Sequence, residues 1–117
     1  MITVEIPMKT ESLANLREHW RKTHQRAKTH RQAAAFHLKH FGARQPPAPP
    51  LLIRFTRLAP RPLDSDNNVI SFKNLRDGVA DYLGVPDNHP GLTFEYAQAK
   101  SAEYRVRIEL VALEMAT

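Results

Sequence analysis

The chain has 117 residues, a net charge of +5 and no cysteine. This length supports one hydrophobic core, so we expect a single domain over residues 1–117. The lack of cysteine excludes disulfides and thiolate metal sites, and no apolar run is long enough to span a bilayer. Charged residues interrupt the N-terminus, which therefore does not resemble a secretory signal. We predict a cytoplasmic protein with no membrane partner.

The basic residues are concentrated in one segment. Residues 16–45 hold eight lysines and arginines against one glutamate, a net charge of +7, so the rest of the chain carries −2. Such an asymmetry favours a polyanionic partner, for example a nucleic acid. A solubilising helix face would have the same composition and remains the alternative.

The first half of the chain predicts a strand followed by a long helix. Apolar residues alternate over 2–6, and residues 13–41 lack Gly and Pro and place apolar side chains at helical spacing. Gly42 is a plausible stop. A second, basic stripe on the same helix has spacings of 4, 3, 4 and 3 residues: Arg17, Arg21, His24, Lys28 and Arg31. Long cations on one rigid face can reach successive phosphates.

The second half predicts three more strands and one more helix. Residues 51–58 read as a strand, 67–83 as a helix stopped by Gly84, and 92–97 and 104–110 as strands, with a hairpin across 99–103. The expected fold class is α/β (α+β), in the order β-α-β-α-β-β, with a small mixed sheet and two helices.

Asp64 and Asp66 stand between a predicted strand and a predicted helix, in the segment Asp64-Ser65-Asp66-Asn67. In extended backbone, residues two apart point to the same side, so the two carboxylates can hold one hard cation such as Mg²⁺. Helix capping is the competing explanation, because Asp and Asn are common where helices begin. An EF-hand is excluded, since Val69 and Leu75 replace its required Gly and Glu.

Two further residues fit a site that acts on phosphate. Lys73 lies seven residues after Asp66, nearly two helical turns, and in one continuous helix would share its face. Asp87 lies in the turn after that helix and could approach the acid pair. The simpler explanations are an ion pair of Lys73 with Asp77 and an ordinary turn residue at Asp87. The histidines do not predict a metal site, although His37 and His40 are three residues apart.

Three segments resemble the RusA family of Holliday-junction resolvases: Leu63-Asp64-Ser65-Asp66-Asn67, Phe72-Lys73-Asn74-Leu75-Arg76-Asp77-Gly78 and Leu83-Gly84-Val85-Pro86-Asp87. The resemblance covers residues 51–113. It implies a homodimeric endonuclease for branched DNA that depends on Mg²⁺, with Mn²⁺ as a possible substitute. By position, Asp64, Asp66 and Asp87 would be metal ligands and Lys73 the catalytic lysine. The chain departs from the family in placing Lys73 two turns after the motif, not one, and in having one acid in the final turn.

The expected function is therefore a structure-selective DNA endonuclease that resolves junctions by paired nicks. The residues expected to bind the DNA backbone are Arg17, Arg21, Lys28, Arg31, Arg61 and Arg76. One alternative is a catalytically idle protein that grips branched DNA or RNA through the basic helix. Another is a structural protein, such as a prophage assembly component, without affinity for branched DNA.

Overall fold

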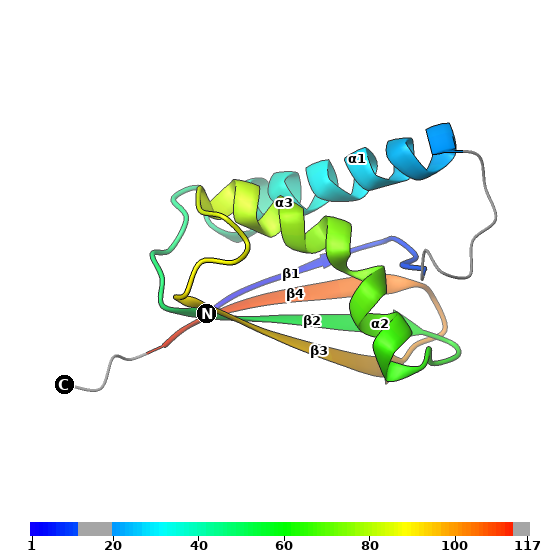
Figure 1. Ribbon diagram of the computed structural model, residues 1–117. Helices are drawn as coiled ribbons and strands as arrows, with labels where there is room; N and C mark the ends of the chain where they lie inside the picture. Colours follow the sequence, from blue (N-terminus) through cyan, green and yellow to red (C-terminus); the bar gives the residue numbers. More distant parts are fainter. Residues whose placement is uncertain (12–19, 114–117) are drawn as a thin grey trace.

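The computed structural model describes residues 1–11 and 20–113. Its elements are β1 (Ile2–Ile6), α1 (Trp20–His37), the π-helical turn η2 (Leu38–Gly42), β2 (Leu51–Ala59), α2 (Ser65–Ser71), α3 (Lys73–Leu83), β3 (Leu92–Lys100) and β4 (Arg105–Ala112) (Figure 1). The predicted strands and the predicted stops at Gly42 and Gly84 are confirmed. The start of the first predicted helix lies outside the described residues.

The four strands form one mixed sheet in the order β1-β4-β2-β3. The strands β2 and β3 are parallel, and β4 runs antiparallel to both β1 and β2. The predicted hairpin between the last two strands is therefore wrong. The chain leaves β3 at one edge, crosses past β2 and inserts β4 in the interior of the sheet.

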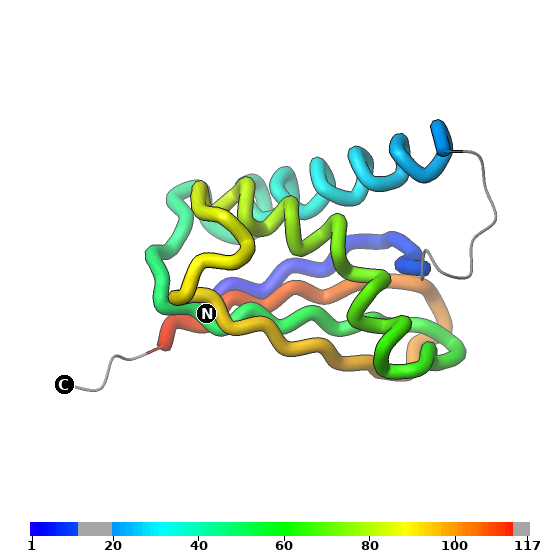
Figure 2. Tube along the Cα trace, in the orientation of Figure 1, coloured from blue at the N-terminus to red at the C-terminus, as the bar shows by residue number. Residues whose placement is uncertain are grey.

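The helices cover one face of this sheet (Figures 1 and 2). Alternate residues of β2 point into the core beneath α1 and α3, and Ile53 and Phe55 are completely buried there together with Ile108 of β4. No helix within residues 1–11 and 20–113 has the length and apolarity needed to cross a membrane.

The opposite face of the sheet is held by cross-strand ion pairs. Arg54 of β2 is paired in register with Glu95 and Glu109, and its guanidinium lies 3.0 and 3.7 Å from their carboxylates. Glu5 of β1 lies 3.2 Å from Arg105 and 3.5 Å from its register partner Arg107, both in β4. The two faces therefore show the apolar and polar alternation expected for a sheet covered on one side.

The second predicted helix is in fact two helices, so the described chain has three helices and not the expected two. Phe72 separates α2 from α3 with φ −95° and ψ 0°. Its ring is completely buried and stacks 5.1 Å from Phe55. Burial of this one side chain holds the junction against the sheet, and the helix axis changes direction there (Figure 2).

Gly78 explains how closely α1 and α3 approach. A Cβ at this position would lie 2.2 Å from the carbonyl oxygen of Arg31 and 2.8 Å from the Cβ of Ala34. Only a glycine leaves room for the two helices at this crossing. Glycine lowers helix propensity by about 1 kcal/mol relative to alanine, but without it α1 and α3 could not pack this closely.

Candidate metal and nucleic-acid site

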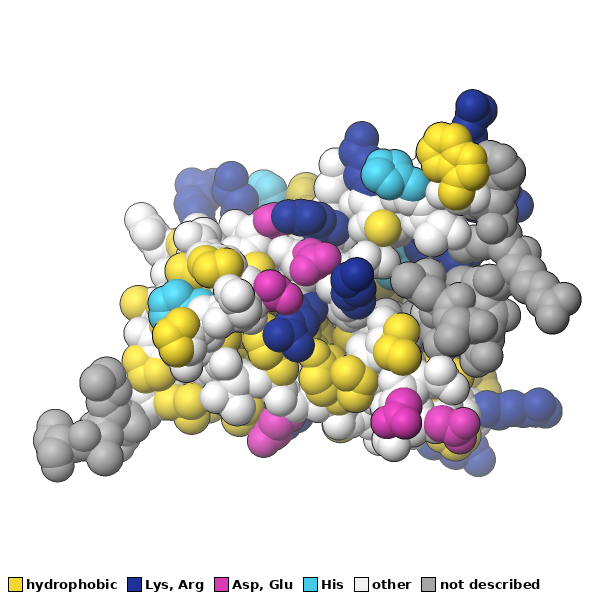
Figure 3. Space-filling model, viewed as in Figure 1, with side chains coloured by type: hydrophobic (Ala, Val, Ile, Leu, Met, Phe, Trp, Pro, Cys, Tyr) yellow, Lys and Arg dark blue, Asp and Glu magenta, His cyan; other side chains and the backbone are white. Residues whose placement is uncertain are grey.

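Asp64 and Asp66 lie where the chain passes from the carboxyl end of β2 into α2. Asp64 occupies the N-cap position, but its side chain makes no capping hydrogen bond. Both carboxylates are exposed, and Figure 3 shows a pair of acidic side chains over the start of α2, apart from those over α3. Capping, the competing explanation for Asp64, is therefore not realised in the structure.

The backbone before this acid pair is clamped to β3. The side-chain amide of Gln98 accepts a hydrogen bond from the N–H of Leu63 at 2.8 Å and donates one to its carbonyl oxygen at 2.7 Å. Asn68, buried in α2, donates to the carbonyl oxygen of Ala97 at 3.2 Å. The acid pair thus stands on a segment fixed from both sides, which is what a preorganised site needs.

Asp87 belongs to a different cluster. Its carboxylate lies 3.3 Å from Nε of Arg76, whose guanidinium also donates to the hydroxyl of Tyr96 at 3.0 Å and lies 3.9 Å from the ring centroid of Phe94. These contacts place Asp87 beside the middle of β3, whereas Leu63 is tied to Gln98 near its end. Phe94 and Gln98 are four positions apart, which corresponds to about 13 Å along the strand.

The structure does not bring the three aspartates together. Among the residues that it describes, no group of three or more His, Cys, Asp or Glu side chains could hold a metal ion. Mg²⁺ commonly uses only one or two protein carboxylates and completes its shell with water and phosphate oxygens. By the chemistry of their side chains, Asp64 and Asp66 supply that smaller donor set, and the set that includes Asp87 does not form. Asp66 lies in the first turn of α2, so the extended-backbone argument that placed both carboxylates on one side does not apply.

Lys73 lies in a groove between α1 and α3, not over the acid pair. Because α2 and α3 are separate helices, the argument that Lys73 shares a helical face with Asp66 does not hold. The groove has a volume of about 340 Å³. Its lining is mostly basic or polar and consists of His24, Ala27, Lys28, Arg31, Lys73, Asn74 and Asp77.

Of the predicted backbone contacts, Lys28 is exposed in this groove, but the charge of Arg31 is largely matched by the protein itself. Its guanidinium binds both carboxylate oxygens of Asp81, at 2.5 and 2.8 Å. The Arg31 hydrogen bond holds the pKa of Asp81 below its usual range, and Asp81 in turn raises the pKa of Arg31. Arg76 is likewise paired with Asp87. Figure 3 shows this interleaving of basic and acidic side chains over α1 and α3.

Arg17, Arg21 and Arg61 are the remaining predicted contacts. Arg21 lies over the ring of Trp20 at the described start of α1, and Arg17 lies outside the described residues. Arg61 is exposed in the loop between β2 and α2. It lines a second cavity, of about 330 Å³, that no sequence motif predicts.

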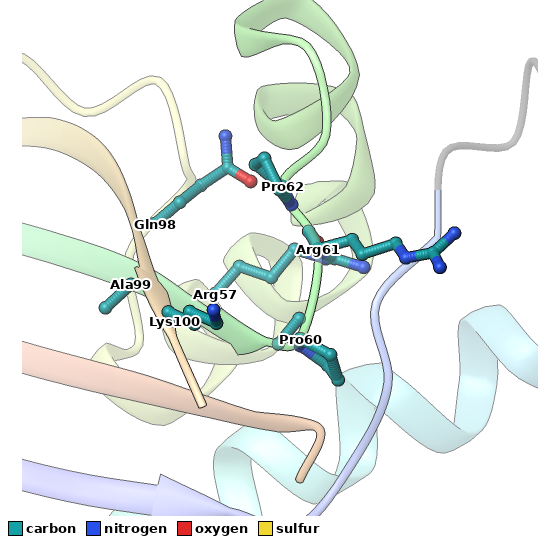
Figure 4. Close-up of a pocket in the computed structure, with 8 residues that line it drawn as sticks. Arg57, Pro60, Arg61, Pro62, Gln98, Ala99 and Lys100 are labelled. Atoms are coloured by element: carbon teal, nitrogen blue, oxygen red, sulfur yellow. The ribbon is translucent and has the colours of Figure 1, made fainter. Parts of the chain in front are cut away.

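That cavity is cationic and lies at the carboxyl ends of the parallel strands (Figure 4). Its lining is Arg57, Ala59, Pro60, Arg61, Pro62, Gln98, Ala99 and Lys100, with no acidic residue among them. Arg57 was missed because it occupies a core-facing position of β2, in phase with Ile53 and Phe55, where strand alternation predicts an apolar side chain. The charge at that position was the only available signal.

His37 and His40 do not form a metal site with other described residues. They stack with two exposed phenylalanines, Phe36 and Phe41, at ring-centroid distances of 4.4 Å for Phe36 with His40 and 5.5 Å for Phe41 with His37. The result is an aromatic surface patch at the end of α1.

Comparison with known proteins identifies no relative: no protein-family model, no curated protein and no solved structure matches this chain.

Proposed function

We propose that this protein is a metal-dependent endonuclease of the RusA type that cleaves branched DNA. The observation that carries the proposal is the exposed acid pair Asp64 and Asp66, free of capping hydrogen bonds and next to a cationic cavity. In open α/β sheets, ligands bind outside the carboxyl ends of the strands. This is the edge at which β2 and β3 end.

The residues of the chain have distinct roles in this proposal. Asp64 and Asp66 hold the ion, and Gln98 keeps their backbone in place through Leu63. A bound Mg²⁺ supplies charge neutralisation and Lewis-acid activation at the phosphate. Lys28 and Lys73, in the groove between α1 and α3, contact the DNA backbone without reading bases.

The assembly proposed is a cytoplasmic homodimer. β1 is an edge strand whose one partner in the described sheet is β4, and Phe36 and Phe41 lie exposed nearby, half or more of each side chain accessible to solvent. Unpaired strand edges and exposed aromatic patches favour association. A two-fold dimer would present two sites to a four-way junction, whose own symmetry is approximately two-fold.

The test is cleavage of a synthetic four-way junction with and without Mg²⁺, with linear duplex as the control substrate. Wild-type protein should nick the junction only with Mg²⁺, and Asp66→Asn should bind the junction without nicking it. Lys73→Gln should weaken binding more than it slows cleavage of bound DNA. If the wild type binds but never cleaves with either Mg²⁺ or Mn²⁺, the nuclease proposal is wrong.

A second candidate function is a catalytically idle protein that binds branched DNA or RNA. The observation in its favour is the position of Asp87, which pairs with Arg76 and does not complete a three-carboxylate site. It predicts salt-sensitive binding of a junction by wild type and Asp66→Asn alike, and no nicking by either.

A further inference from the structure

We propose that the cavity floored by Arg57 and flanked by Arg61 and Lys100 binds a backbone phosphodiester of the DNA strand that passes the acid pair. This inference rests on the proposed function for its substrate class and adds a binding site that the sequence did not indicate. The cavity of about 330 Å³ lies within the range of ligand sites, roughly 300–1,000 Å³.

The first argument is the state of Arg57. The residue is 4% exposed, and no described carboxylate lies within ion-pair distance of it. Burial has the largest influence on the pKa of its guanidinium and lowers it, while Tyr104 and Glu11 raise it by less. The carboxylate of Glu11 is bound to Lys9 instead, at 2.9 Å. Buried charges are normally paired, and an anion in the cavity would supply the missing partner.

The second argument is that Arg57 is held in place by the protein and still has free hydrogen-bond donors. Its guanidinium donates to the carbonyl oxygens of Thr10 at 3.3 Å and Arg61 at 2.8 Å and lies over the ring of Tyr104. Figure 4 shows it running from β2 beneath the loop at Arg61. These two bonds engage two of the five N–H groups of a guanidinium. A purely structural role would explain these contacts but not the cavity lined by two further cations.

The third argument is position. Pro62 lines the cavity and is two residues before Asp64, and Gln98, which also lines it, holds Leu63. A strand seated here therefore runs beside the acid pair. Two exposed carboxylates repel DNA, and three cations next to them offset that repulsion where the strand must approach.

The experiment measures binding of a four-way junction in metal-free buffer, so cleavage plays no part. The double variant Arg61→Gln/Lys100→Gln removes two exposed cations from the cavity rim. The control Lys39→Gln/Arg44→Gln removes the same charge from exposed positions at the other end of β2. The slope of log K against log salt should fall by about 1 in the rim variant, as expected for the loss of one phosphate contact, and by clearly less in the control. Equal changes in the two variants would overturn the proposal.

A second arm locates the phosphate. Neutral methylphosphonates replace the junction phosphodiesters one position at a time, and 5′-phosphorylated strands are compared with 5′-hydroxyl strands. Wild type should lose affinity at one or two internal positions, and the rim variant should lose nothing further there. A uniform loss at every position, or a response to the terminal phosphate alone, would refute the assignment. The same differences in binding are expected when the experiment is repeated with Asp66→Asn. Failure of the wild type to nick the junction would therefore refute the nuclease proposal without bearing on this phosphate site.

Discussion

The charged side chains around α3 form ion pairs within the protein, whereas those around the start of α2 do not form ion pairs with described residues. On α3 and its neighbours, Arg31 is bound to Asp81 and Arg76 to Asp87. At the start of α2, Asp64 and Asp66 make no ion pair with a described residue, and neither does Arg57 beneath them. Paired charges fix the arrangement of helices, whereas unmatched charges of both signs at one sheet edge are suited to an ion and a phosphate from outside.

The largest expected effect is a difference in cleavage rate between a variant of the acid pair and a variant of Asp87. Asp66→Asn should reduce Mg²⁺-dependent junction cleavage by about 100-fold or more, a barrier increase of roughly 2.7 kcal/mol. Asp87→Asn should reduce it by less than about tenfold, and the lost partner of Arg76 should lower stability by at most about 1 kcal/mol. Single-turnover cleavage rates and urea unfolding measure the two quantities. Equal loss of cleavage in both variants would show that Asp87 joins the metal site after all.

The next effect concerns the packing of α3 against α1. Gly78→Ala should lower the free energy of unfolding by about 1–3 kcal/mol, because the new Cβ meets the backbone of α1. Helix propensity alone predicts a gain of about 1 kcal/mol. The sign of the measured change in the free energy of unfolding therefore distinguishes the steric effect from the propensity effect. Urea denaturation provides the measurement, with Asn74→Ala on the same helix as the control. A more stable Gly78→Ala protein would contradict the close approach of α1 and α3.

A third test loosens the site without removing a charge. Gln98→Ala removes both hydrogen bonds to Leu63 and should cost about 1–2 kcal/mol of stability, since each such bond contributes about 1 kcal/mol. Cleavage should fall in kcat with little change in junction affinity, because the acid pair would lose its fixed position. Gln98→Glu retains the acceptor for the Leu63 N–H, so its stability and its cleavage rate should lie between those of the wild type and Gln98→Ala. Unchanged cleavage by Gln98→Ala would show that the clamp is irrelevant to the site.

The smallest effect is a pH dependence within the helical layer. Burial, with a contribution from nearby Arg26, lowers the pKa of His30, and Glu11 opposes this shift. The unfolded chain therefore binds a proton more readily than the folded one, and stability must fall as the pH drops below the ordinary histidine pKa of about 6.5. Urea unfolding at about pH 7.5 and about pH 5.5 should show a loss in wild type that is smaller in His30→Leu. Identical losses would exclude His30 as the cause.

The strands and helix stops could be predicted because alternation and glycine act locally. Ile2, Val4 and Ile6 alternate whatever strand they pair with, and Gly84 adopts φ +73° as an end-of-helix glycine does. Alternation specifies faces and not neighbours, so the sequence could not reveal that β4 lies between β1 and β2. The break at Phe72 was hidden because no Gly or Pro marks it in the sequence. It depends on stacking with Phe55, which is distant in sequence.

The candidate site was predicted only in part. The pair Asp64 and Asp66 was visible as a motif, and the structure exposes both side chains beyond the end of β2. Their binding of a metal stays a prediction. The approach of Asp87 depended on which end of the helix the following turn returns to, which spacing does not determine. Arg57 and Lys100 carry no motif and meet Arg61 only because β2 and β3 end side by side in register, as Ala59 and Lys100 show.

The interior position of β4 also constrains how the molecule is made. The first strand, Ile2–Ile6, has β4 as its partner, and β4 begins at Arg105. During synthesis, β1 must therefore stay unpaired until β4 has been made. Pairings that close so long a loop are slow to form. The pairing of β1 with β4 should therefore be a late step of folding.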